Sequence, residues 1–155
     1  MSFPSAPLEL AFLALQAFQV AFLWLHDWLP MGRLNDVAAV RRADSLPRLI
    51  LVTLIQSVPY TYGLYGSVRH FGHAYPMWLM LWLWISYGLL FLGELRAWWI
   101  PYLFQAEPKR AARYHAMFGN THAFLPRHNG IVPNTLHCLL HAATAATLVV
   151  LYFAT

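Results

Sequence analysis

Four long apolar segments dominate the pattern of hydrophobic and polar positions along the chain. They cover roughly residues 8–29, 47–68, 75–100 and 133–153, and shorter polar stretches separate them. A helix needs about 20 mostly apolar residues to cross the hydrocarbon core of a bilayer. Because lipid offers the backbone no hydrogen-bond partners, such segments are expected to be helices. The pattern predicts an all-α integral membrane protein, a four-helix up-down bundle that forms one transmembrane domain over residues 1–155.

The connection between the third and fourth segments is the longest, and it mixes aromatic, apolar and basic residues. It spans residues 105–132, whereas helices in bundles are usually joined by about 2–8 residues. A connection of this length predicts a structured loop rather than a simple turn. Within it, residues 107–118 are expected to form a short interfacial helix. Its Tyr114, Met117 and Phe118 would then point toward lipid, and its basic residues toward the headgroups.

Composition and charge agree with a membrane location. The chain is 59% hydrophobic and 10% charged, against about 25% charged residues in soluble domains. The positive-inside rule places basic connections in the cytoplasm, so both termini are expected outside a bacterial inner membrane. The net charge of +4 is not expected to indicate nucleic-acid binding, because no nucleic-acid-reading element accompanies it. The basic residues of the first and third connections are Arg33, Arg41, Arg42, Arg48, Lys109, Arg110, Arg113 and Arg127.

A candidate polar site lies at the cytoplasmic end of the predicted bundle. His137 and His141 of the segment "HCLLH" are four residues apart, which places both imidazoles on one helix face. Glu94 follows a charge-free run in the third segment and lies about 9 Å before the expected helix end at Ile100. Because charged groups inside a bilayer are costly, Glu94 is a candidate functional residue. The three side chains are predicted to lie at similar depth.

Several kinds of chemistry would use this set, and the spacing does not choose between them. Two histidines and one carboxylate suit iron, and His122 of the third connection could complete a metal site with Glu94, His137 and His141. With zinc, Glu94 could instead be the catalytic general base. A haem would require His26 to face one of the helical histidines. A proton relay needs only Glu94 and the histidines, and a purely structural role at helix contacts is the remaining alternative.

The start of the fourth helix is a candidate binding site for a lipid phosphate or another anion. Asn134 is expected to cap this helix. The free backbone amides of the first turn, together with Arg113 and Arg127, could then hold the anion. A plain solvated loop is the alternative interpretation.

The favoured hypothesis is a small membrane enzyme or redox protein with a transition metal (Fe or Zn) or haem. It would act on a lipid-like or quinone-like molecule. A non-enzymatic membrane subunit, assembly factor or lipid-binding module is the first alternative, with a membrane protein partner. An oligomeric proton-coupled transporter is the second, and it would require a homo-oligomer. The sequence contains no GxSxG, P-loop or dinucleotide fingerprint that would favour another enzyme class.

Overall fold

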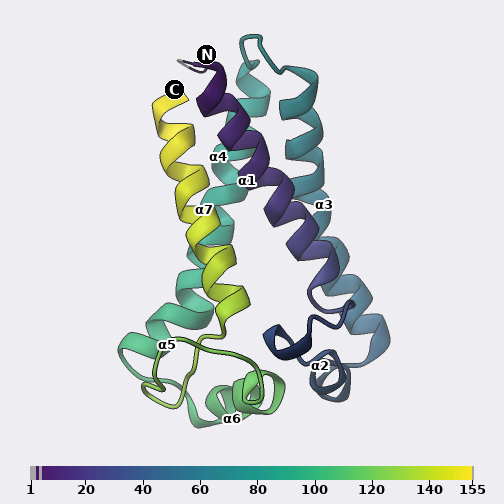
Figure 1. Cartoon of the computed structure of the whole chain (residues 1–155), viewed down its shortest axis with the longest axis vertical. Coiled ribbons are helices and arrows are strands. Elements are labelled where there is room, and N and C mark those ends of the chain that lie inside the picture. The colour runs from purple at the N-terminus through teal and green to yellow at the C-terminus, as the bar shows by residue number, and fades with distance from the viewer. Residues whose placement is uncertain (1–2, 4, 155) are drawn as a thin grey trace.

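The computed structural model describes residues 3 and 5–154, and its regular elements in this part of the chain are helices. Four long helices run along the longest axis of the molecule in alternating directions, with both termini at one end (Figure 1). Short helices and the long loop lie at the other end, here called the loop end (Figure 1). The predicted all-α class is confirmed. The long helices are α1 Ala6–Leu25, α3 Leu46–Arg69, α4 Met77–Glu94 and α7 Thr135–Ala154.

Three helical segments of the described residues are long and apolar enough to cross a membrane. They are α1, the continuous segment Met77–Leu103 and α7. The predicted span 47–68 corresponds to α3, which has sufficient length but is not among the three. Its composition is more polar because hydroxyl and amide side chains, such as Thr53, Gln56 and Ser57, occur within it.

Local sequence signals explain where several helices begin and end. The Asn134 Oδ1 atom accepts a hydrogen bond of 3.1 Å from the backbone N–H of His137, so Asn134 caps α7 as expected. Asp36 caps the short helix α2, Val37–Ala43, in the same way. The third long helix continues beyond the predicted end. A π-helical turn, Leu95–Trp99, follows α4 directly and leads into α5, Ile100–Leu103.

The core lies between α1, α3, α4 and α7. Its centre contains large side chains that are completely buried, among them Phe12, Leu79 and Tyr87. Glycine allows α3 to approach α4 closely, because a Cβ atom on Gly66 would lie 2.6 Å from the Cδ1 atom of Leu79. Small residues at helix interfaces are typical of membrane bundles, where close backbone packing replaces the hydrophobic driving force. The packing of α3 on α4 therefore depends on this glycine.

A row of polar side chains on α1 is buried inside the bundle. Glu9, Gln16 and Gln19 are each at most 5% exposed, and their spacing places them on one helix face. The Gln16 Nε2 atom donates to the Ser67 hydroxyl of α3 at 3.0 Å. The Gln19 Nε2 atom donates to the Thr147 hydroxyl of α7 at 2.7 Å. Such interhelical hydrogen bonds join α1 to both of its neighbours.

The predicted interfacial helix exists as α6, Pro108–Phe118, but its apolar face points inward. The ring of Trp98 lies 4.6 Å from the ring of Tyr114 and 5.2 Å from that of Phe118, measured between centroids. Met117 is buried as well. The expectation that these three side chains point toward lipid is therefore wrong. The protein interior offers all three the same apolar environment, and Trp98 packs against Tyr114 and Phe118.

Candidate functional site

One cavity of about 380 Å³ at the loop end brings together four of the predicted site residues, and it is here called the inner cavity. Glu94 comes from α4, His137 and His141 come from α7, and His26 lies at the C-terminal end of α1. A mainly apolar part of the cavity lining comes from α3 and α4. Its residues are Ile55, Gln56, Tyr60, Leu89, Leu90 and Gly93. The inner cavity therefore combines ionisable side chains with a mainly apolar surface.

Glu94 is buried, and its two carboxyl oxygens have different surroundings. The Thr144 hydroxyl donates to Oε1 at 2.8 Å. The same hydroxyl lies 3.0 Å from the Gln19 Oε1 atom and 3.1 Å from the Leu140 carbonyl oxygen, so three acceptors compete for its single proton. Oε2 has no hydrogen-bond partner in the described part of the chain. Because buried polar atoms nearly always have a partner, Oε2 marks a place for water or a ligand.

His141 is fixed by the tryptophan at the end of the π-helical turn. The Trp99 Nε1–H group donates to Nδ1 of His141 at 3.1 Å. An indole nitrogen can only donate, so Nδ1 must be the accepting nitrogen of the imidazole. We therefore assign the proton of the neutral ring to Nε2. No residue of the described chain forms a hydrogen bond with this nitrogen, so it is available as a donor.

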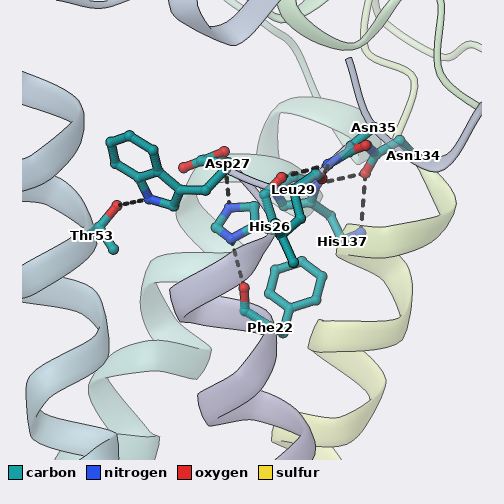
Figure 2. Close-up of polar contacts among 9 residues, drawn as sticks. Phe22, His26, Asp27, Leu29, Asn35, Thr53, Asn134 and His137 are labelled. Atoms are coloured by element: carbon teal, nitrogen blue, oxygen red, sulfur yellow. Dashed lines mark hydrogen bonds and ion pairs between the residues drawn. The ribbon is translucent and has the colours of Figure 1, made fainter. Parts of the chain in front are cut away.

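His137 has the opposite tautomer. Its Nδ1 atom lies 2.6 Å from the Asn134 Oδ1 atom, which can only accept a hydrogen bond, so Nδ1 carries the proton (Figure 2). Nε2 is then an acceptor. The ring packs among aromatic side chains, with its centroid 4.6 Å from Trp98 and 5.0 Å from Phe118. The two helical histidines thus offer one donor and one acceptor.

Both ring nitrogens of His26 have polar partners within the protein. Nδ1 lies 2.9 Å from the carbonyl oxygen of Phe22, and Nε2 lies 3.3 Å from the Asp27 carboxylate (Figure 2). The ring stacks on Phe22 at 4.5 Å between centroids and meets His137 edge-on at 5.7 Å. Because the His26 and His137 rings are in direct contact, no porphyrin fits between them. This arrangement does not favour the predicted cofactor-binding role of His26.

Asp27 lies just beyond the end of α1 and adds a buried carboxyl to this region. Burial raises the pKa of Asp27, the positive charge of a protonated His26 opposes the rise, and the negative charge of Asp44 adds to it. Asp27 therefore holds a proton more readily in the folded protein than in the unfolded chain.

The predicted metal set does not converge. Within residues 3 and 5–154, no group of three or more His, Cys, Asp or Glu side chains has an arrangement that could hold a metal ion. His122 does not line the inner cavity. Its Nδ1 atom lies 2.7 Å from the Thr135 hydroxyl, and its backbone N–H donates to the Arg33 carbonyl. His122 thus connects the long loop to the start of α7 and to the first connection.

A second cavity of about 590 Å³ adjoins the inner cavity and is here called the basic cavity. Gly93 and Ala97 line both cavities. The cations of the basic cavity are Arg48, Arg96, Lys109, Arg110 and Arg113. A third, apolar hollow of about 610 Å³ lies between the α4–α5 segment and α7, and His141 lines it together with Trp99. His141 therefore stands between the inner cavity and this apolar hollow.

The three residues of the predicted anion site have separate partners. Arg113 lines the basic cavity and forms an ion pair of 2.6 Å with Asp44. Arg127 lies 2.9 Å from the His115 ring. The Asn134 side chain is used by the cap of α7 and by His137. The positive charge gathers at the basic cavity, and these contacts do not unite the three residues at the first turn of α7.

Thr144 and Gln19 were not identified from the sequence, although both contribute to the surroundings of Glu94. Gln19 had a usable signal, because an amide in an otherwise apolar membrane helix is costly unless it has a partner or a function. Thr144 had only a weak signal. It lies three residues after His141 on the same helix, but threonine is common in membrane helices.

Comparison with protein-family models, with curated proteins and with solved structures finds no match for this chain. The function must therefore be argued from the site itself.

Proposed function

We propose that the chain is a four-span membrane bundle, with α3 as the fourth span beside the three apolar segments. The face of α3 that points away from the bundle supports this, because it is apolar. Its exposed residues include Leu46, Ile50, Leu51, Leu54 and Val58. The basic connections lie together at the loop end, so the positive-inside rule places this end in the cytoplasm and both termini outside. The membrane would be a bacterial inner membrane.

We propose that the inner cavity binds the polar head of a lipid-like or quinone-like amphiphile and exchanges a proton with it. The observation that carries this proposal is the Glu94 Oε2 atom, which is buried, has no partner in the described chain and belongs to a carboxyl that lines the cavity. Ligand sites typically combine apolar walls with a few polar groups that fix orientation. Here the apolar wall of α3 and α4 would take the start of the tail.

The polar groups suit acid–base chemistry on an oxygen of the ligand. The Nε2–H group of His141 would donate a hydrogen bond to a carbonyl or hydroxyl oxygen, and Glu94 would give or take the proton. His137, with its accepting Nε2, would receive a hydroxyl proton. A quinone-like head has two carbonyl oxygens, and these could accept from the His141 Nε2–H group and from a protonated Glu94 at once. The apolar hollow beside His141 offers a second path for the tail.

Binding of a short-chain quinone by the purified full-length protein tests this proposal. Trp98 lines the inner cavity, so a bound quinone is expected to quench its fluorescence, and a Trp98→Phe variant identifies that signal. His141→Phe should raise the Kd about tenfold, the effect of losing one good hydrogen bond. Glu94→Gln should preserve binding but remove its pH dependence.

Glu107→Gln is the matched control, because Glu107 is an exposed acid that lines the basic cavity and not the inner one. It should leave both the Kd and the pH dependence unchanged. Quenching that does not saturate, or that is the same in the wild type, His141→Phe and Glu94→Gln, would contradict the proposal.

A proton path across the bundle is a second candidate, favoured by the buried polar row of α1. From the loop end, Glu94, Thr144 and Gln19 are connected by hydrogen bonds. Toward the other end, Gln16 contacts Ser67, and its Oε1 atom is buried without a partner in the described residues. Amides do not relay protons readily, so ordered water would have to bridge the turn between the two glutamines.

Proton flux into vesicles with a trapped pH dye tests the second candidate, with a potassium diffusion potential as the driving force. Glu94→Gln should abolish a flux that uses this path, and Gln16→Leu should reduce it strongly. Glu107→Gln again serves as the control. A flux that is absent from the wild type, or that persists in Glu94→Gln, would exclude this path.

A further inference from the structure

The basic cavity is built by three elements that meet at the loop end. Arg48 comes from the first turn of α3, Arg96 from the π-helical turn, and Lys109, Arg110 and Arg113 from α6. Glu107 is the acidic residue that lines it. Cations from separate elements that line one hollow create a stronger field than the same charges spread over a surface.

The charges of the basic cavity are only partly neutralised. Asp44 forms ion pairs with Arg48 at 3.2 Å and with Arg113 at 2.6 Å. In the described part of the chain, Arg96, Lys109 and Arg110 have no acidic partner within ion-pair distance. The Arg110 Nη1 atom donates to the backbone carbonyl of Arg96 at 3.1 Å, which holds the guanidinium of Arg110 beside that turn. Three cations therefore remain available for an anionic ligand.

The π-helical turn connects the basic cavity to the inner cavity. Gly93 and Ala97 line both cavities, whereas Glu94 lines only the inner cavity and Arg96 only the basic one. Single π-helical turns inside α-helices occur frequently at functional sites. Here the turn starts directly after Glu94, so Glu94 and Arg96 lie within one turn of helix. Glu94 lines the inner cavity, and Arg96, which has no acidic partner in the described chain, lines the adjoining basic cavity.

We propose that the basic cavity binds a phosphate group, and that the amphiphile of the inner cavity carries this phosphate as its headgroup. Arg96 and Arg110 can each form two parallel hydrogen bonds to phosphate oxygens, and Lys109 adds a point charge. The dianionic charge of a phosphate monoester matches this excess of positive charge better than a single carboxylate does. The part of the polar head next to the phosphate then lies in the inner cavity, with an oxygen beside Glu94.

The size and position of the basic cavity favour a small headgroup. A hollow of about 590 Å³ accommodates a phosphate and its nearest substituents. The phosphate site is inferred from the residues that line the basic cavity. Only the position of the ligand's tail rests on the proposed function of the inner cavity. The phosphate source can be a phospholipid or free inorganic phosphate, and the two must be separated by experiment.

Native mass spectrometry of the detergent-purified full-length protein tests the inference with phosphatidic acid and phosphatidylcholine. Calorimetry with inorganic phosphate gives the second measurement. The test variant is Arg96→Gln/Arg110→Gln. The matched control is Arg42→Gln/Arg41→Gln, which removes two exposed positive charges of α2 at the same end of the molecule but outside the basic cavity.

Phosphatidic acid should bind more tightly than phosphatidylcholine, and the test variant should weaken this binding tenfold or more, roughly the effect of losing one charge-assisted hydrogen bond. The control should change it less than about twofold, within the effect expected for exposed charges. If inorganic phosphate binds with the same arginine dependence and phosphatidic acid does not, the phosphate site is supported with a soluble source. No preference for phosphatidic acid together with no binding of inorganic phosphate would overturn the inference. So would equal losses in the test and control variants.

The quinone-quenching assay separates failure of this inference from failure of the proposed function. If phosphate-bearing ligands fail to bind while quinone quenching persists, the phosphate site is wrong and the inner-cavity proposal stands. If quenching fails while arginine-dependent binding of phosphatidic acid persists, the phosphate site stands and the inner-cavity proposal falls.

Discussion

Replacing Thr144 by valine tests how Glu94 is held, because valine has nearly the same shape and lacks only the hydroxyl. Thr144 is completely buried, and its hydroxyl serves both Glu94 Oε1 and Gln19 Oε1. A hydrogen bond to a charged group contributes about 1.5–3 kcal/mol, and an interhelical bond in a membrane bundle about 0.6 kcal/mol. The expected loss of stability is therefore about 2–4 kcal/mol. The Thr144→Val substitution also leaves both carboxyl oxygens of Glu94 without a partner in the described chain.

Thr147→Val is the matched control for this prediction. Thr147 is equally buried and lies one turn further along α7, but it has no bond to Glu94. Its hydroxyl accepts from the Gln19 amide and donates to the Ala143 carbonyl of its own helix. Gln19 Nε2 keeps its bond to the Leu15 carbonyl when Thr147 is replaced, so the expected loss is about 0.6–1.7 kcal/mol. Each kcal/mol corresponds to about 2–4 °C in the Tm for a chain of this size.

Thermal unfolding in mild detergent, followed by tryptophan fluorescence, measures both variants. The Thr144→Val variant is expected to unfold at a clearly lower temperature than Thr147→Val. In a Glu94→Leu background the cost of Thr144→Val should fall to that of Thr147→Val, because the carboxyl is no longer present. Equal shifts for the two threonine variants in the wild-type background would refute the reasoning that Thr144 supports the carboxyl.

Three further predictions concern the surroundings of the site. Asn134→Ala should cost about 0.5–2 kcal/mol, because it removes the α7 cap; unchanged thermal unfolding would contradict this role. Gly66→Ala should destabilise by about 1–3 kcal/mol because its Cβ would collide with Leu79, and no change in Tm would show that α3 and α4 can separate. Burial raises the pKa of Asp27 above 3.8, so the folded state binds this proton more tightly. The resulting stabilisation is present below about pH 3.8 and is lost as the pH rises through the folded pKa. The Tm of Asp27→Asn relative to the wild type should therefore increase from about pH 4 to pH 8, and a constant difference would exclude this linkage.

The fold class and the positions of the long helices could be read from the sequence because apolar length is a strong signal. The expected spans and the observed helices share most of their residues. Departures occur where local geometry intervenes. The third helix was expected to end at Ile100, but the π-helical turn leads into α5. Pro101 lies in the first turn of α5, where no intrahelical partner for its nitrogen is required. No periodic pattern indicates such a turn in advance.

The depth of the candidate site residues along the bundle could be predicted from the sequence, but their hydrogen-bond partners could not. Charge placement and helix rise put Glu94, His137 and His141 at one end of the bundle, and all three line the inner cavity. Depth alone could not identify the bonds that Trp99, Asn134 and Thr144 make to these side chains. These contacts depend on the rotation of each helix about its axis, which packing determines. Likewise, the apolar residues of α6 could be buried either in lipid or in the protein interior beside Trp98. Their hydrophobicity is the same in both cases, so it does not distinguish the two environments.

Glu94 lines the inner cavity, which we propose a membrane amphiphile can enter. Reaction with dicyclohexylcarbodiimide, an apolar reagent for buried carboxyl groups, tests this most directly when the modified residue is identified by peptide mass spectrometry. We expect modification at Glu94, suppression of that modification by a short-chain quinone or by phosphatidic acid, and no such suppression at the buried Glu9 of the opposite end. A Glu94 carboxyl that stays unmodified, or that reacts equally with and without both ligands, would contradict this proposal.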